Sequence, residues 1–142
     1  MTDRVLVPMD GASPSEQALE HALSAHPDAE IVVLHVIGFV DSEEEIGRLQ
    51  GDRRDRYERA EAEADRIFAR AEELAGPTGV ELSTDVAFGP PARAIPAYAE
   101  DHDIDHIVMG NHGQAGARQI LLGSVAETVV RRAPVPVTVV RE

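Results

Sequence analysis

A glycine-rich stretch toward the C-terminus carries residues whose types and spacing suit the binding of an anion. Glycines occupy positions 110, 113, 116 and 123 between Met109 and Ser124. Glycine lets the main chain approach a ligand closely and adopt positive φ angles. A helix is expected to begin at Ser124, and the free N–H groups of its first turn, together with the helix dipole, attract negative charge. The spacing therefore predicts a phosphate site built from main-chain amides.

The donors predicted for this phosphate site are the amides of Gly113, Gly123, Ser124 and Val125, together with the Ser124 hydroxyl. Hydrogen bonds to a charged group contribute about 1.5–3 kcal/mol each, so several of them suffice for micromolar binding of a polyphosphate. A structural alternative is that Ser124 and Glu127 form a capping box, which would occupy the same amides. Arg118 is either a further positive group for the phosphate or a solvated side chain.

Asp10 is the second polar group of interest, because it directly follows the apolar run 5–9. A carboxylate at the end of a buried strand can accept hydrogen bonds from ribose hydroxyls; the alternative is a turn residue in Asp10-Gly11. His35 lies inside the apolar run 31–37 and is interpreted as a core histidine with satisfied hydrogen bonds rather than as a ligand. The segment 101–106 is interpreted as a solvated acidic loop rather than a metal site, because its histidine spacing fits no helical pair.

Composition excludes several kinds of chemistry. All 13 basic residues are arginine, so neither a lysine-containing phosphate loop nor a Schiff-base enzyme is possible. The absence of cysteine excludes disulfides, thiol catalysis and cysteine metal sites. The net charge is −13 and no basic patch of useful size is present, so a nucleic-acid partner is not expected. The acid excess indicates a halophilic source, whereas a GC-rich genome would explain only the missing lysine.

No apolar run approaches the ~18 residues that a membrane span requires. The N-terminal run 5–9 is also too short for the core of a signal peptide. The chain is therefore expected to be cytoplasmic, without a membrane partner.

Apolar periodicity predicts five strands that alternate with four helices. The strands are expected at 5–9, 31–37, 80–88, 104–109 and 135–140, and the helices at 13–26, 53–75, about 91–101 and 124–132. This alternation is typical of a parallel sheet with right-handed crossovers. By analogy with flavodoxin-like and Rossmann-like folds, we expect one α/β domain over residues 1–142, with an open five-stranded parallel sheet in the order 3-2-1-4-5 and helices on both faces.

Three local features are expected within these elements. Ser13 should cap the first helix in a capping box with Glu16. Pro96 should kink the third helix along the chain or delay its start, because proline lacks the N–H that a helix interior uses. The acidic stretch 41–50 is expected to be mobile.

In open parallel sheets, ligands bind beyond the carboxyl ends of the strands, where the strand order reverses. In the expected order the reversal lies between the first and fourth strands. The loops at that point are residues 8–11 and the glycine-rich stretch. Asp10 and the predicted phosphate site should therefore face the same crevice.

The glycine pattern resembles that of the universal stress protein family, in the branch that binds ATP. Gly110-Asn111-His112-Gly113, nine further residues and then Gly123-Ser124 fit the pattern G-x2-G-x9-G-S/T. Segments 5–10, 33–36, 107–110, 121–125 and 133–137 are also similar to family segments, in the same order. The resemblance covers the whole chain.

The resemblance implies a site for ATP or another adenine nucleotide. Adenine would lie near the main chain of Val36 and close to Met109, and the ribose would meet Asp10 and Gly110. The phosphates would be held by Gly113, Gly123, Ser124 and Val125. Pro8 and Met9 would line the pocket, although Met9 departs from the usual Thr or Val. His112 would either contact phosphate or pack within the loop, and a divalent ion such as Mg or Mn would be carried on the phosphates.

Three functions remain open on this sequence. The first is a regulatory module that switches with nucleotide occupancy during stress. The second is a slow ATP hydrolase or a nucleotidyl transferase, which needs an oriented water and charge stabilisation at the γ-phosphate. Only Glu127 is placed for such a role once Asp10 binds ribose, so binding with slow or no turnover is expected. The third is a dimeric scaffold with an empty pocket. No protein partner is indicated.

The fifth strand would be an edge of the sheet, and it is apolar from Val135 to Val140 with no charge before Arg141. An exposed apolar edge invites pairing with another strand. A two-fold contact between equal strands satisfies that edge, and it is common in the family that the chain resembles. The sequence therefore predicts a homodimer through residues 135–140.

Overall fold

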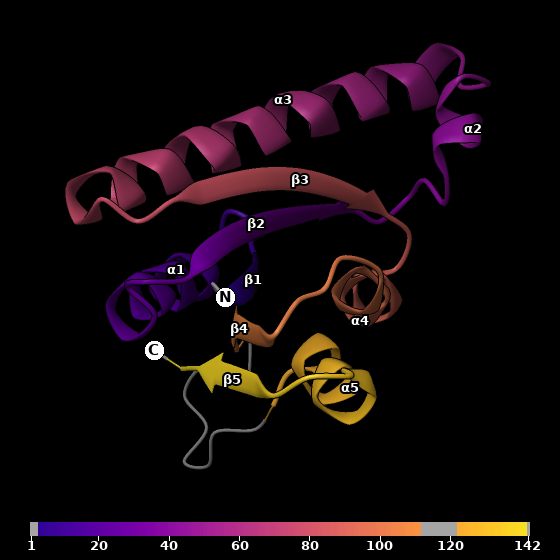
Figure 1. Ribbon diagram of the computed structural model, residues 1–142. Coiled ribbons are helices and arrows are strands. Elements are labelled where there is room, and N and C mark those ends of the chain that lie inside the picture. Colours follow the sequence, from indigo (N-terminus) through magenta and orange to yellow (C-terminus); the bar gives the residue numbers. More distant parts are fainter. Residues whose placement is uncertain (1–2, 112–121, 142) are drawn as a thin grey trace.

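The computed structural model describes residues 3–111 and 122–141 (Figure 1). The strands are β1 (Arg4–Pro8), β2 (Glu30–Ile37), β3 (Leu82–Phe88), β4 (His106–Gly110) and β5 (Val137–Val140). The helices are α1 (Ser13–Ala25), α2 (Glu43–Ile46), α3 (Gly51–Ala75), α4 (Pro91–Asp101) and α5 (Ser124–Arg132), with a short 3-10 turn at Gly76–Thr78. The predicted alternation of strands and helices is confirmed, with boundaries shifted by up to two residues.

The five strands form one parallel sheet in the order β3-β2-β1-β4-β5. This confirms the expected flavodoxin-like order and places β3 and β5 at the two edges. The carboxyl ends of β1 and β4 are neighbours, although a long stretch of sequence separates them. The strand order therefore reverses at the place where the sequence analysis expects a ligand.

Helices cover both faces of the sheet (Figure 1). Side chains alternate between faces along a strand, so Val5 and Val7 pack in one cluster with residues of α1 and α3. Leu6 points the other way and packs with residues of α4 and α5. Because both faces are covered, the central strands carry apolar residues at consecutive positions rather than at alternate ones.

The start of α1 differs from the prediction, because Ser13 does not cap the helix. The N-cap is Ala12, with extended backbone angles and no side-chain cap. The Asp10 Oδ1 accepts a hydrogen bond from the Ala12 N–H at 3.0 Å, and Gly11 has φ of +86°. This tight turn brings the chain into the helix one residue earlier than expected, so that Ser13 is its first residue.

Two further local predictions concern Pro96 in α4, expected to kink the helix or delay its start, and the acidic stretch 41–50. Helix α4 begins at Pro91 and runs through Pro96, so its start is not delayed. Proline is favoured in the first turn of a helix, which explains why Pro91 sets the boundary. The acidic stretch 41–50 contains the short helix α2, whose N-cap Ser42 accepts a hydrogen bond from the Glu45 N–H; the mobility expected for this stretch stays a prediction.

Glu45 holds α2 in place by two further contacts. Its carboxylate accepts hydrogen bonds from the Asp41 N–H at 2.9 Å and from Arg53 at 2.6 Å. These two bonds lower the pKa of Glu45, with the main-chain bond from Asp41 as the larger cause.

Within residues 3–111 and 122–141, no helix is long and apolar enough to cross a membrane.

Candidate functional site

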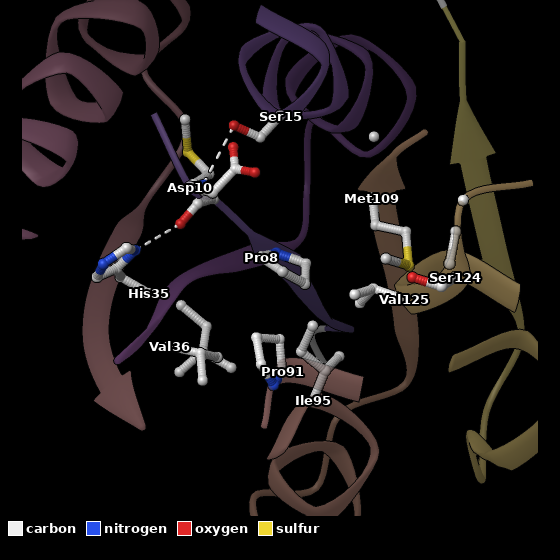
Figure 2. Close-up of a pocket in the computed structure, with 15 residues that line it drawn as sticks. Pro8, Asp10, Ser15, His35, Val36, Pro91, Ile95, Met109, Ser124 and Val125 are labelled. Atoms are coloured by element: carbon white, nitrogen blue, oxygen red, sulfur yellow. Dashed lines mark hydrogen bonds between the residues drawn. The ribbon is translucent and has the colours of Figure 1, made fainter. Parts of the chain in front are cut away.

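A pocket of about 330 Å³ opens at the carboxyl ends of β1, β2 and β4 (Figure 2). It lies between α4 on one side and the start of α5 on the other. This volume is at the lower end of the range for small-molecule sites, and a mostly apolar lining with a few polar groups is typical of such sites. The pocket coincides with the reversal of strand order.

Most of the residues singled out in the sequence lie together around this pocket. The described lining includes Pro8, Met9, Asp10, Val36, Met109, Gly110, Gly123, Ser124 and Val125. His112, Gly113 and Arg118 lie outside the described residues. The lining also includes residues that the sequence analysis did not assign to a site, namely Ser15, Leu34, His35, Pro91, Ile95 and Ala126.

Asp10 lies exposed at the pocket rim, on the turn that connects β1 to α1. Besides accepting from the Ala12 N–H, it donates its own N–H to Ser15 Oγ at 3.4 Å. The Ser15 hydroxyl in turn donates to the Ala12 carbonyl at 2.9 Å. The turn role is therefore confirmed, and the same turn presents the carboxylate to the pocket.

The main chain of Val36 faces the pocket side of β2. Hydrogen-bonding groups of successive strand residues point alternately to the two neighbouring strands. The Leu34 carbonyl accepts from the Met9 N–H at 2.8 Å, toward β1, and the Ile37 carbonyl accepts from the Gly89 N–H at 3.2 Å, away from β1. The N–H and C=O of Val36 must therefore point to the β1 side of β2. Since the last residue of β1, Pro8, pairs with Leu34, Val36 lies past the end of β1.

The start of α5 supplies main-chain donors at the other end of the pocket. Its N-cap is Gly123, with no side-chain cap, so the structural alternative of a capping box at Ser124 is not formed. The carboxylate of Glu127 instead contacts Arg131 at 2.8 Å, one turn along the helix. The first intrahelical bond runs from the Glu127 N–H to the Gly123 carbonyl, so the amides of residues 124–126 have no partner within the helix.

Asn111 holds the start of α5 against the end of β4. Its Oδ1 accepts a hydrogen bond from the Gly123 N–H at 2.8 Å, and its own N–H donates to the Val140 carbonyl. The Gly123 amide, predicted as a phosphate donor, is therefore engaged by Asn111 in this structure. Asn111 is 7% exposed. The sequence pattern does not single out Asn111, because it occupies an unspecified position of the glycine motif.

Helix α4 supplies the apolar wall of the pocket through Pro91 and Ile95 (Figure 2). Tyr98 fixes this helix to the sheet, because its hydroxyl donates to Asp85 on β3 at 2.7 Å. Burial, and secondly this hydrogen bond, raise the pKa of Tyr98 well above its usual value. This wall could have been predicted from topology, because the loop after β3 lies at the same edge of the sheet as the loops after β1 and β2.

Gly110 lies where α1 packs closely on the end of β4. A Cβ atom at this position would lie 2.4 Å from both the carbonyl carbon and the oxygen of Pro14. Such distances are far below van der Waals contact, so only glycine fits here. The packing explains the residue type at this position independently of any ligand.

Comparison with known proteins agrees with the geometry. The model of the universal stress protein family matches residues 1–141. A curated relative, universal stress protein MJ0531 of Methanocaldococcus jannaschii, is 34% identical over 98% of this chain and 82% of its own length.

Solved structures show the same fold. The structure of MJ0577 superposes with a TM-score of 0.80, at 30% identity, covering 100% of this chain and 97% of that one. An Arabidopsis thaliana universal stress protein family member with AMP bound has a TM-score of 0.72 at 20% identity, covering 99% and 92% of the two chains. The chain therefore belongs to the universal stress protein family.

Proposed function

We propose that residues 1–142 form a single domain that binds an adenine nucleotide, with ATP as the expected ligand, and that nucleotide occupancy switches its role in a stress response. One observation carries this proposal. A single pocket joins the β1-facing main chain of Val36 at one end to the first-turn amides of α5, which have no partner within that helix, at the other. These are recognition groups for a base and for a phosphate, respectively.

The base end of the pocket suits adenine. The N–H and C=O of Val36 form a donor–acceptor pair, and adenine offers the complementary N1 acceptor and N6 amino donor. Guanine has an oxo acceptor in place of the amino donor and an N1–H donor in place of the N1 acceptor. In the same orientation it would therefore place an acceptor against the Val36 C=O and a donor against the Val36 N–H. Pro91 and Ile95 lie near Val36 and provide apolar surface at this end, and Leu34 and Met109 line the same pocket (Figure 2). The Arabidopsis family member of the same fold, with AMP bound, is consistent with this assignment.

In this proposal the ribose meets Asp10 and the main chain of Gly110. The phosphates meet the amides of Ser124 and Val125 and the Ser124 hydroxyl, with Gly113 and His112 contributing from outside the described residues. Mg or Mn is carried on the phosphates. The net charge of −13 opposes anion binding only weakly, since charge interactions are screened beyond about 8 Å at physiological salt and about 3 Å at 1 M.

Binding without rapid turnover is the function that the phosphate end supports better. Hydrolysis would need a carboxylate or similar group that orients a water at the γ-phosphate. Glu127, the candidate from the sequence, directs its carboxylate to Arg131 on the outer side of α5. We therefore assign this chain to nucleotide binding rather than to catalysis.

Native mass spectrometry of freshly purified protein, before and after addition of ATP and Mg²⁺, tests the proposal. We expect a mass shift that corresponds to one adenine nucleotide per chain. Addition of GTP under the same conditions should give little shift. A protein that stays unliganded at millimolar ATP would contradict the proposal, and rapid conversion of bound ATP to ADP would favour the hydrolase instead.

We also propose that two copies pair through the edge strand β5. The side chains of β5 are all half-buried, and no other strand of the described chain lies on its outer side. The Pro136 carbonyl accepts from Ile107 of β4 and the Val140 carbonyl from Asn111 just after β4, so by alternation the N–H of Val139 points to the free edge. An unpaired edge of this kind pairs readily with an equal strand.

The substitution Val139→Pro should convert such a dimer into a monomer. Proline removes the outward N–H without removing a donor to β4, and edge strands tolerate proline in this orientation. Light scattering at micromolar concentration should report a dimer for the wild type and a monomer for the variant. A monomeric wild type, or a V139P protein that remains dimeric, would refute pairing through β5.

A further inference from the structure

The hydrogen-bond ladder between β1 and β2 ends one main-chain bond earlier than the register of the two strands would allow. At its beginning the Glu30 N–H donates to the Asp3 carbonyl at 2.9 Å, and near its end the Met9 N–H donates to the Leu34 carbonyl at 2.8 Å. In a parallel ladder, a residue paired with residue j of the next strand donates its N–H to the carbonyl of residue j−1. Its own carbonyl accepts from the N–H of residue j+1. The next bond in the series would run from the Val36 N–H to the Met9 carbonyl.

A side chain takes the place of that bond. The Nδ1 atom of His35 lies 2.8 Å from the Met9 carbonyl oxygen, as the dashed line in Figure 2 shows. A carbonyl oxygen can only accept, so His35 must carry a proton on Nδ1 and donate it. Within the described residues no hydrogen bond joins the Val36 N–H to Met9. The expected hydrogen bonding of His35 is therefore confirmed, but its expected place in the core is wrong, because His35 is half-buried and lines the pocket.

We propose that His35 is a positioning residue that ends the β1–β2 ladder early and so keeps the Val36 N–H available to the base of the nucleotide. This inference rests on the proposed function and adds the determinant of base selectivity. If Val36 donated to Met9, the pocket would keep only the Val36 carbonyl as a polar group on that side. The preference for a purine with an acceptor at N1 would then be lost.

The position of His35 fits this role. It precedes Val36 on β2, and its side chain reaches across to the segment that follows β1. Met9 is 3% exposed and packs into the core, and its N–H donates to the Leu34 carbonyl, so the position of its own carbonyl is well defined. The imidazole therefore donates its hydrogen bond to an acceptor whose position is fixed.

Hydrogen exchange of the unliganded protein tests the ladder directly, without any nucleotide. After correction for intrinsic rates, the Val36 amide of the wild type should exchange at least about tenfold faster than the Leu34 amide, which lies inside the ladder. In His35→Leu the Met9 carbonyl is released, and Val36 protection should rise by about tenfold. His35→Asn, whose amide NH₂ can donate from a similar place, should retain the wild-type pattern. Equal protection of Val36 and Leu34 in the wild type would overturn the inference.

Base selectivity gives the second readout. Calorimetric titrations should compare ATP with inosine triphosphate, which has an oxo group and an N1–H in place of the amino group and N1 acceptor. We expect the wild type to prefer ATP by at least about tenfold. H35L should lose most of this preference through weaker ATP binding, whereas H35N should keep it.

An H35L protein that folds with wild-type thermal stability and still keeps the full preference for ATP would refute the role of His35. A wild type that binds neither triphosphate would instead refute the proposed function. In that case the exchange experiment still decides whether His35 ends the ladder.

Discussion

Replacing Gly110 with alanine should lower the free energy of unfolding by about 3 kcal/mol or more, among the largest effects of any single methyl group in this protein. The added Cβ would lie 2.4 Å from the Pro14 carbonyl carbon and oxygen and 2.9 Å from the Pro14 Cβ. Relief is difficult, because Pro14 has a fixed φ angle and lies in the first turn of α1, whose buried face packs in the core. Either α1 or β4 would have to move, and residues of both elements line the pocket.

Urea unfolding of wild type, Gly110→Ala and Gly76→Ala should be measured together. Gly76 ends α3, has a negative φ angle and has nothing within 4 Å of an added Cβ, so G76A should lie within about 0.5 kcal/mol of the wild type. G110A should show a lower midpoint with a similar slope. If G110A were as stable as G76A, the close approach of α1 to β4 would be wrong.

The second large effect is expected for Ser124→Pro, which should weaken ATP binding by about 10–100-fold. The substitution removes one main-chain N–H and one hydroxyl from the proposed phosphate site, and hydrogen bonds to charged groups contribute about 1.5–3 kcal/mol each. The fold should tolerate the change. Ser124 is the first residue of α5, where proline is favoured, and Gly123 has ψ of 161°, which suits a residue before proline.

Two controls separate the contributions at this position. Ser124→Ala keeps the amide and loses only the hydroxyl, so it should weaken ATP binding less than S124P does. Adenosine, which has no phosphate, should bind wild type and S124P equally. If S124P bound ATP as well as the wild type does, the amides at the start of α5 would not hold the phosphates.

The fold was largely predictable because its strands carry strong local signals. The run 31–37 is apolar at nearly every position, which is typical of a strand buried on both faces, and β2 occupies an interior position in the sheet. The alternation of strands and helices then left few topologies open. Element ends were less predictable. The Asp10 turn, for example, moved the start of α1 through a hydrogen bond that composition does not reveal.

The candidate site was predictable where residue type carried the signal, and not where tertiary contacts did. Glycine spacing located the start of α5, and Asp10 was located by its place after a strand. Asn111 and His35 act through bonds to the main chain of residues distant in sequence, Gly123 and Met9 respectively. Neither partner can be inferred from local pattern, because each depends on how two strand ends and a helix meet.

The central claim is that the pocket between Val36 and the start of α5 binds an adenine nucleotide. Calorimetric titration of the wild-type protein with ATP and Mg²⁺, beside S124P in the same buffer, tests it most directly. We predict binding of one ATP per chain with a Kd near 1 μM, about −8 kcal/mol, and clearly weaker binding to the variant. The absence of any binding heat up to millimolar ATP, or identical isotherms for both proteins, would contradict the account.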